Sequence, residues 1–201
     1  MSSLALPRSN GTTLYAVAAL VAVAELGVLW LSLHPSVPAD YRAYYLDQST
    51  TCLDEPVPGT YLPGMTLRTV SGHEAAVKSI NVCGWEGPVG NGLHAVGEQS
   101  RLRFTIWPGS HGLTLLLEMS AVDMAQSSGQ PVDIVANGTR IGRAQVLAGM
   151  PQSFTFAVPD SALSGKDVLD VELRYPEAIL ISPQDSNTRK RSIKLTAVRV
   201  G

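Results

Sequence analysis

The sequence predicts an all-β domain, a two-layer antiparallel sandwich of the jelly-roll type, preceded by one N-terminal transmembrane helix. Two observations lead to this prediction. The run from Leu14 to Leu33 contains a single charged side chain, Glu25. From about Tyr61 onward apolar and polar residues alternate with period two, and no long amphipathic helical pattern follows. The predicted division of the chain is a leader (1–13), the transmembrane helix (14–34), a linker (35–60) and the sandwich (61–201).

The composition excludes two classes of protein. The chain of 201 residues has 15 Lys+Arg against 17 Asp+Glu, a net charge of −2. A nucleic-acid binder that depends on phosphate neutralisation needs a clear basic excess, so we expect no nucleic-acid partner. Hydrophobic residues make up 45% of the chain, which excludes a largely disordered protein.

The apolar run has the length of a membrane span. At 1.5 Å per residue its helix covers about 30 Å, the hydrocarbon thickness of a bilayer. Arg8 is the only charged side chain before the run, so the positive-inside rule places the N-terminus in the cytoplasm and the sandwich outside the cytoplasmic (inner) membrane, in the periplasm or the extracellular space. A cleaved signal peptide is the alternative, with cleavage after Val37-Pro38-Ala39.

Glu25 places an ionisable side chain within the predicted membrane span. An ionisable side chain in a membrane span costs about 2.5–3.5 kcal/mol, and it usually faces a protein partner or is protonated. Ala18, Ala22 and Glu25 lie on one stripe of the helix, where small residues permit close approach. One interpretation is docking on a multi-pass membrane protein. The alternative is that the helix simply tolerates one protonated glutamate.

The linker is rich in proline and acidic residues, and it contains a tyrosine cluster. Tyr41, Tyr44 and Tyr45 either form a short interfacial helical turn or pack on the domain. Cys52 in the linker and Cys83 beyond it are the two cysteines of the chain. In an oxidising compartment they form a disulfide; the alternative is two separate buried thiols.

The β-domain is predicted from its alternating segments. Each has one face for the core and one for solvent. Asn137-Gly138 between two such segments predicts a tight hairpin, because both central residues of that turn take a positive φ. The predicted strands include Leu102–Ile106, Leu113–Met119, Val132–Ala136, Thr139–Val146, Phe154–Val158, Leu169–Leu173 and Ile193–Ala197.

The sequence holds no strong catalytic or metal-binding motif. His73-Glu74 lacks the second histidine of a zinc-protease helix, and the four histidines have no metal-ligand spacing. No spacing pairs two carboxylates for glycoside hydrolysis. We therefore expect no catalytic residue, no metal and no cofactor, with a surface glycan-active enzyme as the less favoured alternative.

Two polar and aromatic stretches are the candidate binding residues. The first stretch, 83–98, contributes Trp85, Glu86 and His94, and the second, 181–189, contributes Asp185, Asn187 and Arg189. An aromatic ring beside carboxylate, amide and guanidinium groups suits the hydroxyls and apolar face of a sugar. The alternative is structural: Trp85 caps the sandwich, and Asp185 pairs with Arg189 to fix a long loop.

The order of several motifs resembles a known family. The motifs are Trp85-Glu86 in a glycine-rich loop before a strand, Val132–Gly138 ending in Asn-Gly, Phe154–Pro159 ending in Val-Pro, and a Ser-Pro…Asp…Arg loop before the last strand. Over residues 75–201 the chain resembles the extracytoplasmic, carbohydrate-binding-like jelly-roll domain of bacterial membrane glycosyltransferases. His94 stands where that family is expected to have a second tryptophan.

This resemblance implies a non-catalytic accessory subunit of a cell-surface polysaccharide synthesis, modification or export complex. Such a subunit docks on a multi-pass membrane protein, a glycosyltransferase or an exporter, and contacts polysaccharide through the sandwich. The alternative is a purely structural interaction subunit of a membrane complex that never touches sugar.

Overall fold

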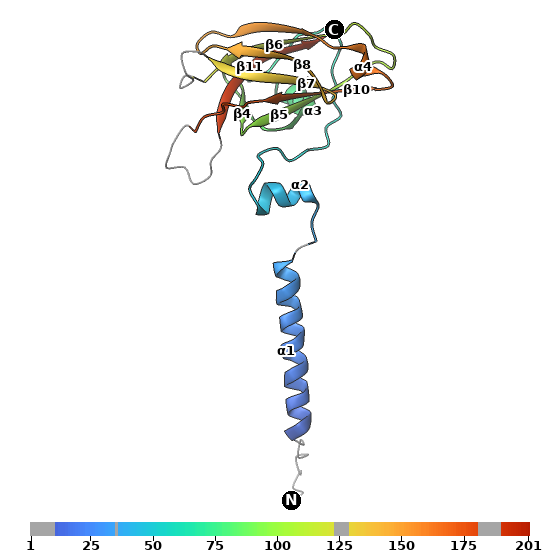
Figure 1. Ribbon diagram of the computed structural model, residues 1–201, viewed down its shortest axis with the longest axis vertical. Coiled ribbons are helices and arrows are strands. Elements are labelled where there is room, and N and C mark those ends of the chain that lie inside the picture. The colour runs from blue at the N-terminus through green and yellow to red at the C-terminus, as the bar shows by residue number, and fades with distance from the viewer. Residues whose placement is uncertain (1–10, 35, 123–128, 181–189) are drawn as a thin grey trace, which may run out of the picture. The chain divides into compact units, whose positions relative to one another are not determined.

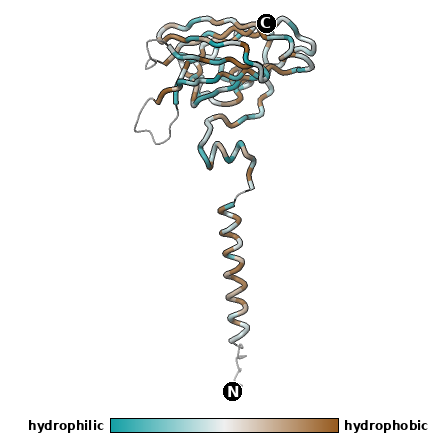
Figure 2. The backbone as a smooth tube through the Cα atoms, viewed as in Figure 1, coloured by the Kyte–Doolittle hydropathy of each residue, from teal (hydrophilic) through white to brown (hydrophobic). Residues whose placement is uncertain are grey.

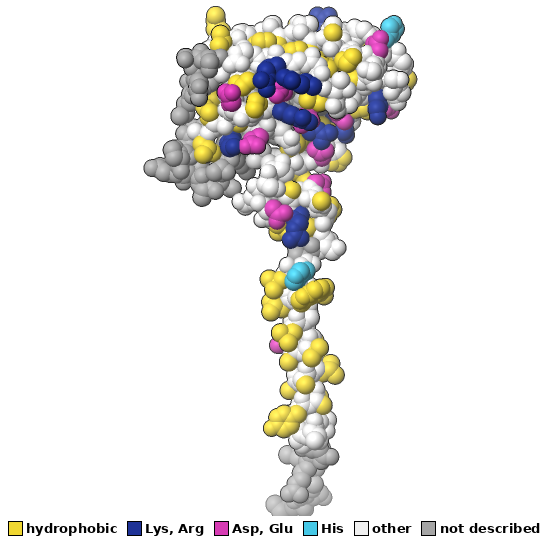
Figure 3. All heavy atoms as spheres, viewed as in Figure 1, with side chains coloured by type: hydrophobic (Ala, Val, Ile, Leu, Met, Phe, Trp, Pro, Cys, Tyr) yellow, Lys and Arg dark blue, Asp and Glu magenta, His cyan; other side chains and the backbone are white. Residues whose placement is uncertain are grey.

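The structure is a computed structural model that describes residues 11–34, 36–122, 129–180 and 190–201. Its ribbon is shown in Figure 1. The chain forms two compact units, the first ending at Pro38 and the second running from Ala39 to Gly201. Figure 3 shows hydrophobic side chains along the helical unit, and acidic and basic side chains interspersed on the other unit.

The first unit is the helix α1 (Gly11–Leu33), which has no buried residue. Among the described residues it is the one helix long and apolar enough to cross a bilayer. Figure 2 shows the hydropathy of its residues along the backbone, with hydrophobic residues through most of the helix. The Ser32 hydroxyl donates a hydrogen bond to the Val28 carbonyl of the same helix at 2.8 Å. The predicted apolar helix is confirmed, and it begins three residues earlier than the sequence predicted.

The second unit is a sandwich of two antiparallel sheets, as the sequence predicts. The first sheet has the order β3-β4-β11-β6-β9, with β1 added against β11, and the second has the order β2-β5-β10-β7-β8. The first sheet contains β1 (Leu67–Arg68), β3 (Trp85–Val89), β4 (Gly92–Val96), β6 (Thr114–Ala121), β9 (Gln152–Ala157) and β11 (Arg191–Val200). The second contains β2 (Asn81–Cys83), β5 (Gln99–Thr105), β7 (Gln130–Ala136), β8 (Thr139–Val146) and β10 (Val168–Arg174).

The core lies between the sheets and follows from the period-two alternation. Leu102 and Phe104 of β5 are fully buried, while Arg101 and Arg103 between and beside them reach solvent. Such burial contributes about 1.5–3 kcal/mol for each large side chain. The described part of the unit also contains four short helices: α2 (Ala39–Tyr41), the π-helix η1 (Arg42–Leu46), α3 (Glu74–Ile80) and α4 (Asp160–Leu163).

The predicted hairpin turn is confirmed. Asn137 has φ 44° and Gly138 has φ 83°, and this turn joins β7 to β8, with Ala136 paired to Thr139. The Asn137 side chain also fixes the neighbouring chain segments: its Nδ2 donates to the carbonyls of Ala162 and Val168, and its Oδ1 accepts from the Asp170 N–H. The asparagine therefore sets both the turn and its contact with β10.

One part of the sequence interpretation is wrong. The stretch after Trp85, read as a glycine-rich loop, forms the antiparallel hairpin β3-β4 at the edge of the first sheet. An edge strand tolerates Pro88 because one side of it needs no ladder hydrogen bond. Gly84 marks the corner at which the chain leaves β2 in one sheet and enters β3 in the other. A Cβ there would lie 2.3 Å from the Gln99 carbonyl oxygen, and the φ of Gly84 is +73°, so the corner requires glycine.

Residues 51–60 lie along the second sheet. The Glu55 N–H donates to the Val82 carbonyl, and the Gly59 N–H donates to the Ser79 carbonyl. Cys52 and Cys83 form the disulfide, with their Cα atoms 4.8 Å apart. These contacts bring the segment that precedes the sandwich against the β2–β3 corner.

Candidate functional site

A groove lies beside the disulfide, within the second unit. It has a volume of about 530 Å³, within the usual range of about 300–1,000 Å³ for ligand sites. One wall comes from η1 and residues 48–55, and the other comes from the β2–β3 corner and the end of β4. Its lining residues are Tyr44, Tyr45, Gln48, Thr50, Thr51, Leu53, Glu55, Asn81, Val82, Cys83, Gly84, Trp85, Glu86 and Val96. We call it the corner groove.

Aromatic side chains stand on both walls of the corner groove. Tyr44 and Tyr45 come from η1, with ring centroids 4.8 Å apart and an edge-to-face tilt of 72°. The Tyr45 residue is 52% exposed, and its ring also contacts Tyr41, with centroids 4.4 Å apart. Trp85 on the opposite wall is half-buried and packs against the core. Its indole N–H donates to the Arg101 carbonyl at 3.1 Å, which fixes the ring.

The polar side chains of the groove are carboxylates, amides and hydroxyls. Glu86 forms an ion pair with Arg191 of β11. Glu55 is exposed and its carboxylate contacts none of the described residues through a hydrogen bond or ion pair. Gln48 and Asn81 add amide groups to the lining. The described lining contains no lysine, arginine or histidine.

His94 lies next to this lining without belonging to it. It faces Glu86 across the β3–β4 ladder and lies opposite Lys194 on its other side. Its Nε2 is 3.2 Å from the Asn91 Oδ1. Burial lowers the pKa of His94, and the positive charges of Lys194 and Arg191 lower it further. These effects outweigh the charge of Glu86, which raises the pKa of His94.

A second cavity of about 370 Å³ adjoins the corner groove. The two cavities share Gln48, Thr50 and Thr51, and the second one extends to the ion pair between Lys190 and Glu98. Together they provide room for a ligand longer than one small ring.

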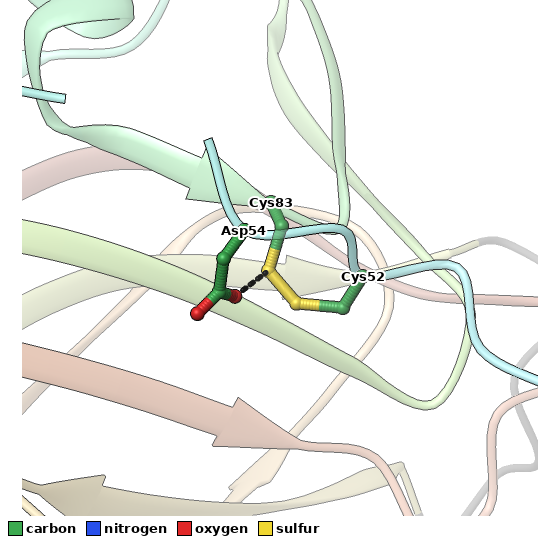
Figure 4. Close-up of side chains that lie close together, drawn as sticks. All are labelled: Cys52, Asp54 and Cys83. Atoms are coloured by element: carbon green, nitrogen blue, oxygen red, sulfur yellow. Dashed lines mark hydrogen bonds between the residues drawn. A yellow bond between two sulfur atoms is a disulfide. The ribbon is translucent and has the colours of Figure 1, made fainter. Parts of the chain in front are cut away.

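Cys52, Asp54 and Cys83 come together at the edge of the groove (Figure 4). The Asp54 Oδ1 lies 3.6 Å from the Cys83 Sγ, but a disulfide sulfur carries neither a proton to donate nor the thiolate charge that binds metals. Asp54 itself is paired with Arg101. With the disulfide formed, this trio does not fit a metal site.

The charged face of the second sheet is paired internally. Arg103 bonds Asp170 at 2.7 Å, and Arg143 bonds Asp133 at 2.7 Å. The hydrogen bond from Arg143, together with the charges of Arg140 and Arg143, lowers the pKa of Asp133 to about 2. These ion pairs connect β5 to β10 and β7 to β8. The corner groove is therefore the better ligand site.

The sequence identified part of this site. Trp85 and Glu86 line the groove, and His94 does not line it but is paired with Glu86 in the β3–β4 ladder. Asp185, Asn187 and Arg189 lie outside the described residues. Sequence reasoning missed Glu55 and did not assign Tyr44 and Tyr45 to the site, although their clustering before Cys52 was a usable signal once the disulfide was expected.

Comparison with known proteins assigns the chain to no family. No protein-family profile matches the chain, and no curated protein matches its sequence. Similar solved structures include the CBM36-1 domain of a xylanase from the hindgut metagenome of Trinervitermes trinervoides, 14% identical over 68% of this chain and 95% of that chain, with TM-score 0.39. The C-terminal CBM6 of LamC from Zobellia galactanivorans is 13% identical over 68% of this chain and 98% of that chain, with TM-score 0.38.

A third is xylanase 10C of Cellvibrio japonicus in complex with xylopentaose. It is 8% identical, over 70% of this chain and 27% of that chain, with TM-score 0.41. The similar structures thus include carbohydrate-binding modules. At these identities and TM-scores, no function of this chain follows from them.

Proposed function

We propose that this protein is a membrane-anchored, non-catalytic glycan-binding subunit of a cell-surface polysaccharide synthesis, modification or export complex. The observation that carries the proposal is the corner groove, with Tyr45 and Trp85 on opposite walls and carboxylate and amide groups between them. An apolar sugar face packs on an aromatic ring, and sugar hydroxyls donate to carboxylates and exchange hydrogen bonds with amides.

Tyr45 is the residue that tests glycan binding. It is exposed and its hydroxyl has no described hydrogen-bond partner, so Tyr45→Ala removes a stacking face without opening the core. We expect the full-length variant in lipid nanodiscs to lose about fivefold to tenfold in affinity for the oligosaccharides that the wild-type protein retains on a glycan array, in line with a ring-stacking contact of about 1–1.5 kcal/mol.

Trp107→Ala is the matched control, because Trp107 is 73% exposed and does not line the groove. Equal binding by the wild type and Tyr45→Ala, or equal losses in both variants, would contradict the proposal. Trp85→Ala is less informative, since it also removes a side chain packed on the core.

The anchor of this subunit is α1, with the N-terminus in the cytoplasm and the sandwich in the periplasm or extracellular space. The disulfide supports an oxidising compartment for the second unit. We place the contact with a multi-pass glycosyltransferase or exporter on the stripe of Ala18, Ala22 and Glu25. The resemblance to polysaccharide-synthesis proteins and the single acidic side chain of α1 support this placement.

A purely structural interaction subunit is the second candidate. The observation that favours it is that Trp85 already uses its indole N–H on the Arg101 carbonyl and packs on the core. On this account Trp85→Ala destabilises the sandwich, while Tyr45→Ala changes neither assembly nor glycan retention.

A further inference from the structure

The charges of the corner groove indicate which class of glycan it binds. This inference rests on the proposed glycan-binding function. Glu55 and Glu86 line the groove, and no basic side chain stands among its described lining residues. The nearby described cations are already paired: Arg191 with Glu86, Arg101 with Asp54, and Lys190 of the adjoining cavity with Glu98. Among the described residues, Glu55 therefore leaves one uncompensated negative charge in the groove.

Aromatic rings add to the attraction for a cation. The face of a tyrosine or tryptophan ring carries negative quadrupole charge, and this charge attracts an ammonium that lies over the face. Tyr44, Tyr45 and Trp85 line the same cavity as Glu55. A neutral sugar uses the rings and hydrogen bonds to the amides and carboxylates, whereas the ammonium of an amino sugar also forms an ion pair with the carboxylate of Glu55.

We infer that the corner groove binds a glycan bearing free amino groups, such as a de-N-acetylated hexosamine polymer, in preference to its neutral or acidic counterparts. The sugar ring stacks on Tyr45, and its ammonium pairs with Glu55. A uronate polymer is disfavoured because its carboxylates meet Glu55 and Glu86 with no free cation among the described lining residues. The adjoining cavity with Gln48 and Thr51 accommodates the next residues of the chain.

The test compares three hexamers on the full-length protein in nanodiscs made of zwitterionic lipid. The probes are glucosamine hexamer, N-acetylglucosamine hexamer and galacturonate hexamer, titrated by calorimetry at a mildly acidic pH that keeps the amines protonated. We expect glucosamine hexamer to bind about threefold to tenfold more tightly than the acetylated hexamer, which corresponds to one partly screened ion pair. Galacturonate hexamer binds most weakly.

Glu55→Gln provides the decisive variant, since it keeps the size of the side chain and removes the charge. It abolishes the preference for the amino form, because the amide carries no charge for the ammonium to pair with. Glu177→Gln, an exposed glutamate outside the groove, keeps the preference. Raising the ionic strength from about 0.05 M to about 0.5 M reduces the preference in the wild type, because salt screens exposed charges.

Two kinds of result overturn the inference, and only the first kind leaves the glycan-binding proposal intact. Equal affinities for the two hexosamine hexamers, or a preference that survives in Glu55→Gln, remove the charge selectivity and leave glycan binding intact. Failure of every hexamer to bind, or binding of hexalysine as tight as that of glucosamine hexamer, removes the glycan-binding proposal as well.

Discussion

At the scale of single residues, a few side chains decide the local geometry. Asn137 takes the positive φ of a hairpin turn, and both its amide nitrogen and its amide oxygen are hydrogen-bonded to other segments. The Asn-Gly-Thr pattern at this position also matches a glycosylation site, but a glycan on Nδ2 would break the hydrogen bonds to Ala162 and Val168. The side chain is thus structural.

Replacing Asn137 tests this account. We expect Asn137→Ala to lower the free energy of unfolding by about 2–3 kcal/mol, because it leaves buried partners unpaired and puts alanine at a positive φ. Asn137→Gly relieves the backbone cost and should lose less. Chemical denaturation of the purified protein measures both variants, and an alanine variant as stable as the wild type would show that the hydrogen bonds contribute little.

Trp85 and Glu86 show which features of single residues could be predicted from the sequence and which could not. The choice of an aromatic residue flanked by an acidic one was informative, because both residues line the groove. The sequence did not show that the indole N–H is already bonded to the Arg101 carbonyl or that Glu86 is paired with Arg191. Those partners stand 16 and 105 positions away along the chain, and no local pattern encodes them.

At the scale of elements, the alternating strands were predictable and the edge hairpin was not. Period two is a local property, and it identified the core faces of β5, β6 and β10. The hairpin β3-β4 was missed because glycine and proline indicate a loop in the sequence, whereas an edge position tolerates them. The corner at Gly84 then directs β3 into the other sheet.

The disulfide is the covalent contact that holds the groove wall in place. The cysteines are 31 positions apart, so loop closure contributes about 3–4 kcal/mol to stability. We expect the double variant Cys52→Ser/Cys83→Ser to lose about that much in chemical denaturation and to bind oligosaccharide more weakly, because residues 48–55 no longer stay against the β2–β3 corner.

Reduction offers an internal control for this prediction. A reductant should reproduce the loss in the wild type and have no further effect on the double variant. An unchanged unfolding midpoint in both would mean that the hydrogen bonds of Glu55 and Gly59 to Val82 and Ser79 hold the segment without the disulfide.

At the scale of the whole molecule, the chain combines a span-length apolar helix with a unit that has its own core. No described residue of α1 is buried, and the helix has the length and apolar composition of a membrane anchor or a signal sequence. The second unit buries its large side chains between its own sheets. These properties suit a tethered binding domain.

Glu25 tests whether the helix does more than anchor. We expect Glu25→Leu to weaken co-purification of a multi-pass membrane protein in mild detergent, because it removes the polar group on the stripe of Ala18 and Ala22. Val23→Leu, on the opposite side of α1, is the matched control. Mass spectrometry of the purified material identifies and quantifies the partner, and undiminished recovery with Glu25→Leu would argue for a simple anchor.

The sequence by itself determined the apolar helix and the two-layer sandwich, because the length of an apolar run and period-two alternation are properties of neighbouring residues. Only the tertiary structure decided the corner groove. Tyr45 and Trp85 are distant in sequence, and they line one cavity because the disulfide and the contacts of residues 51–60 bring the two segments together. Long-range contacts of this kind depend on how the sheets pack, which local patterns do not specify.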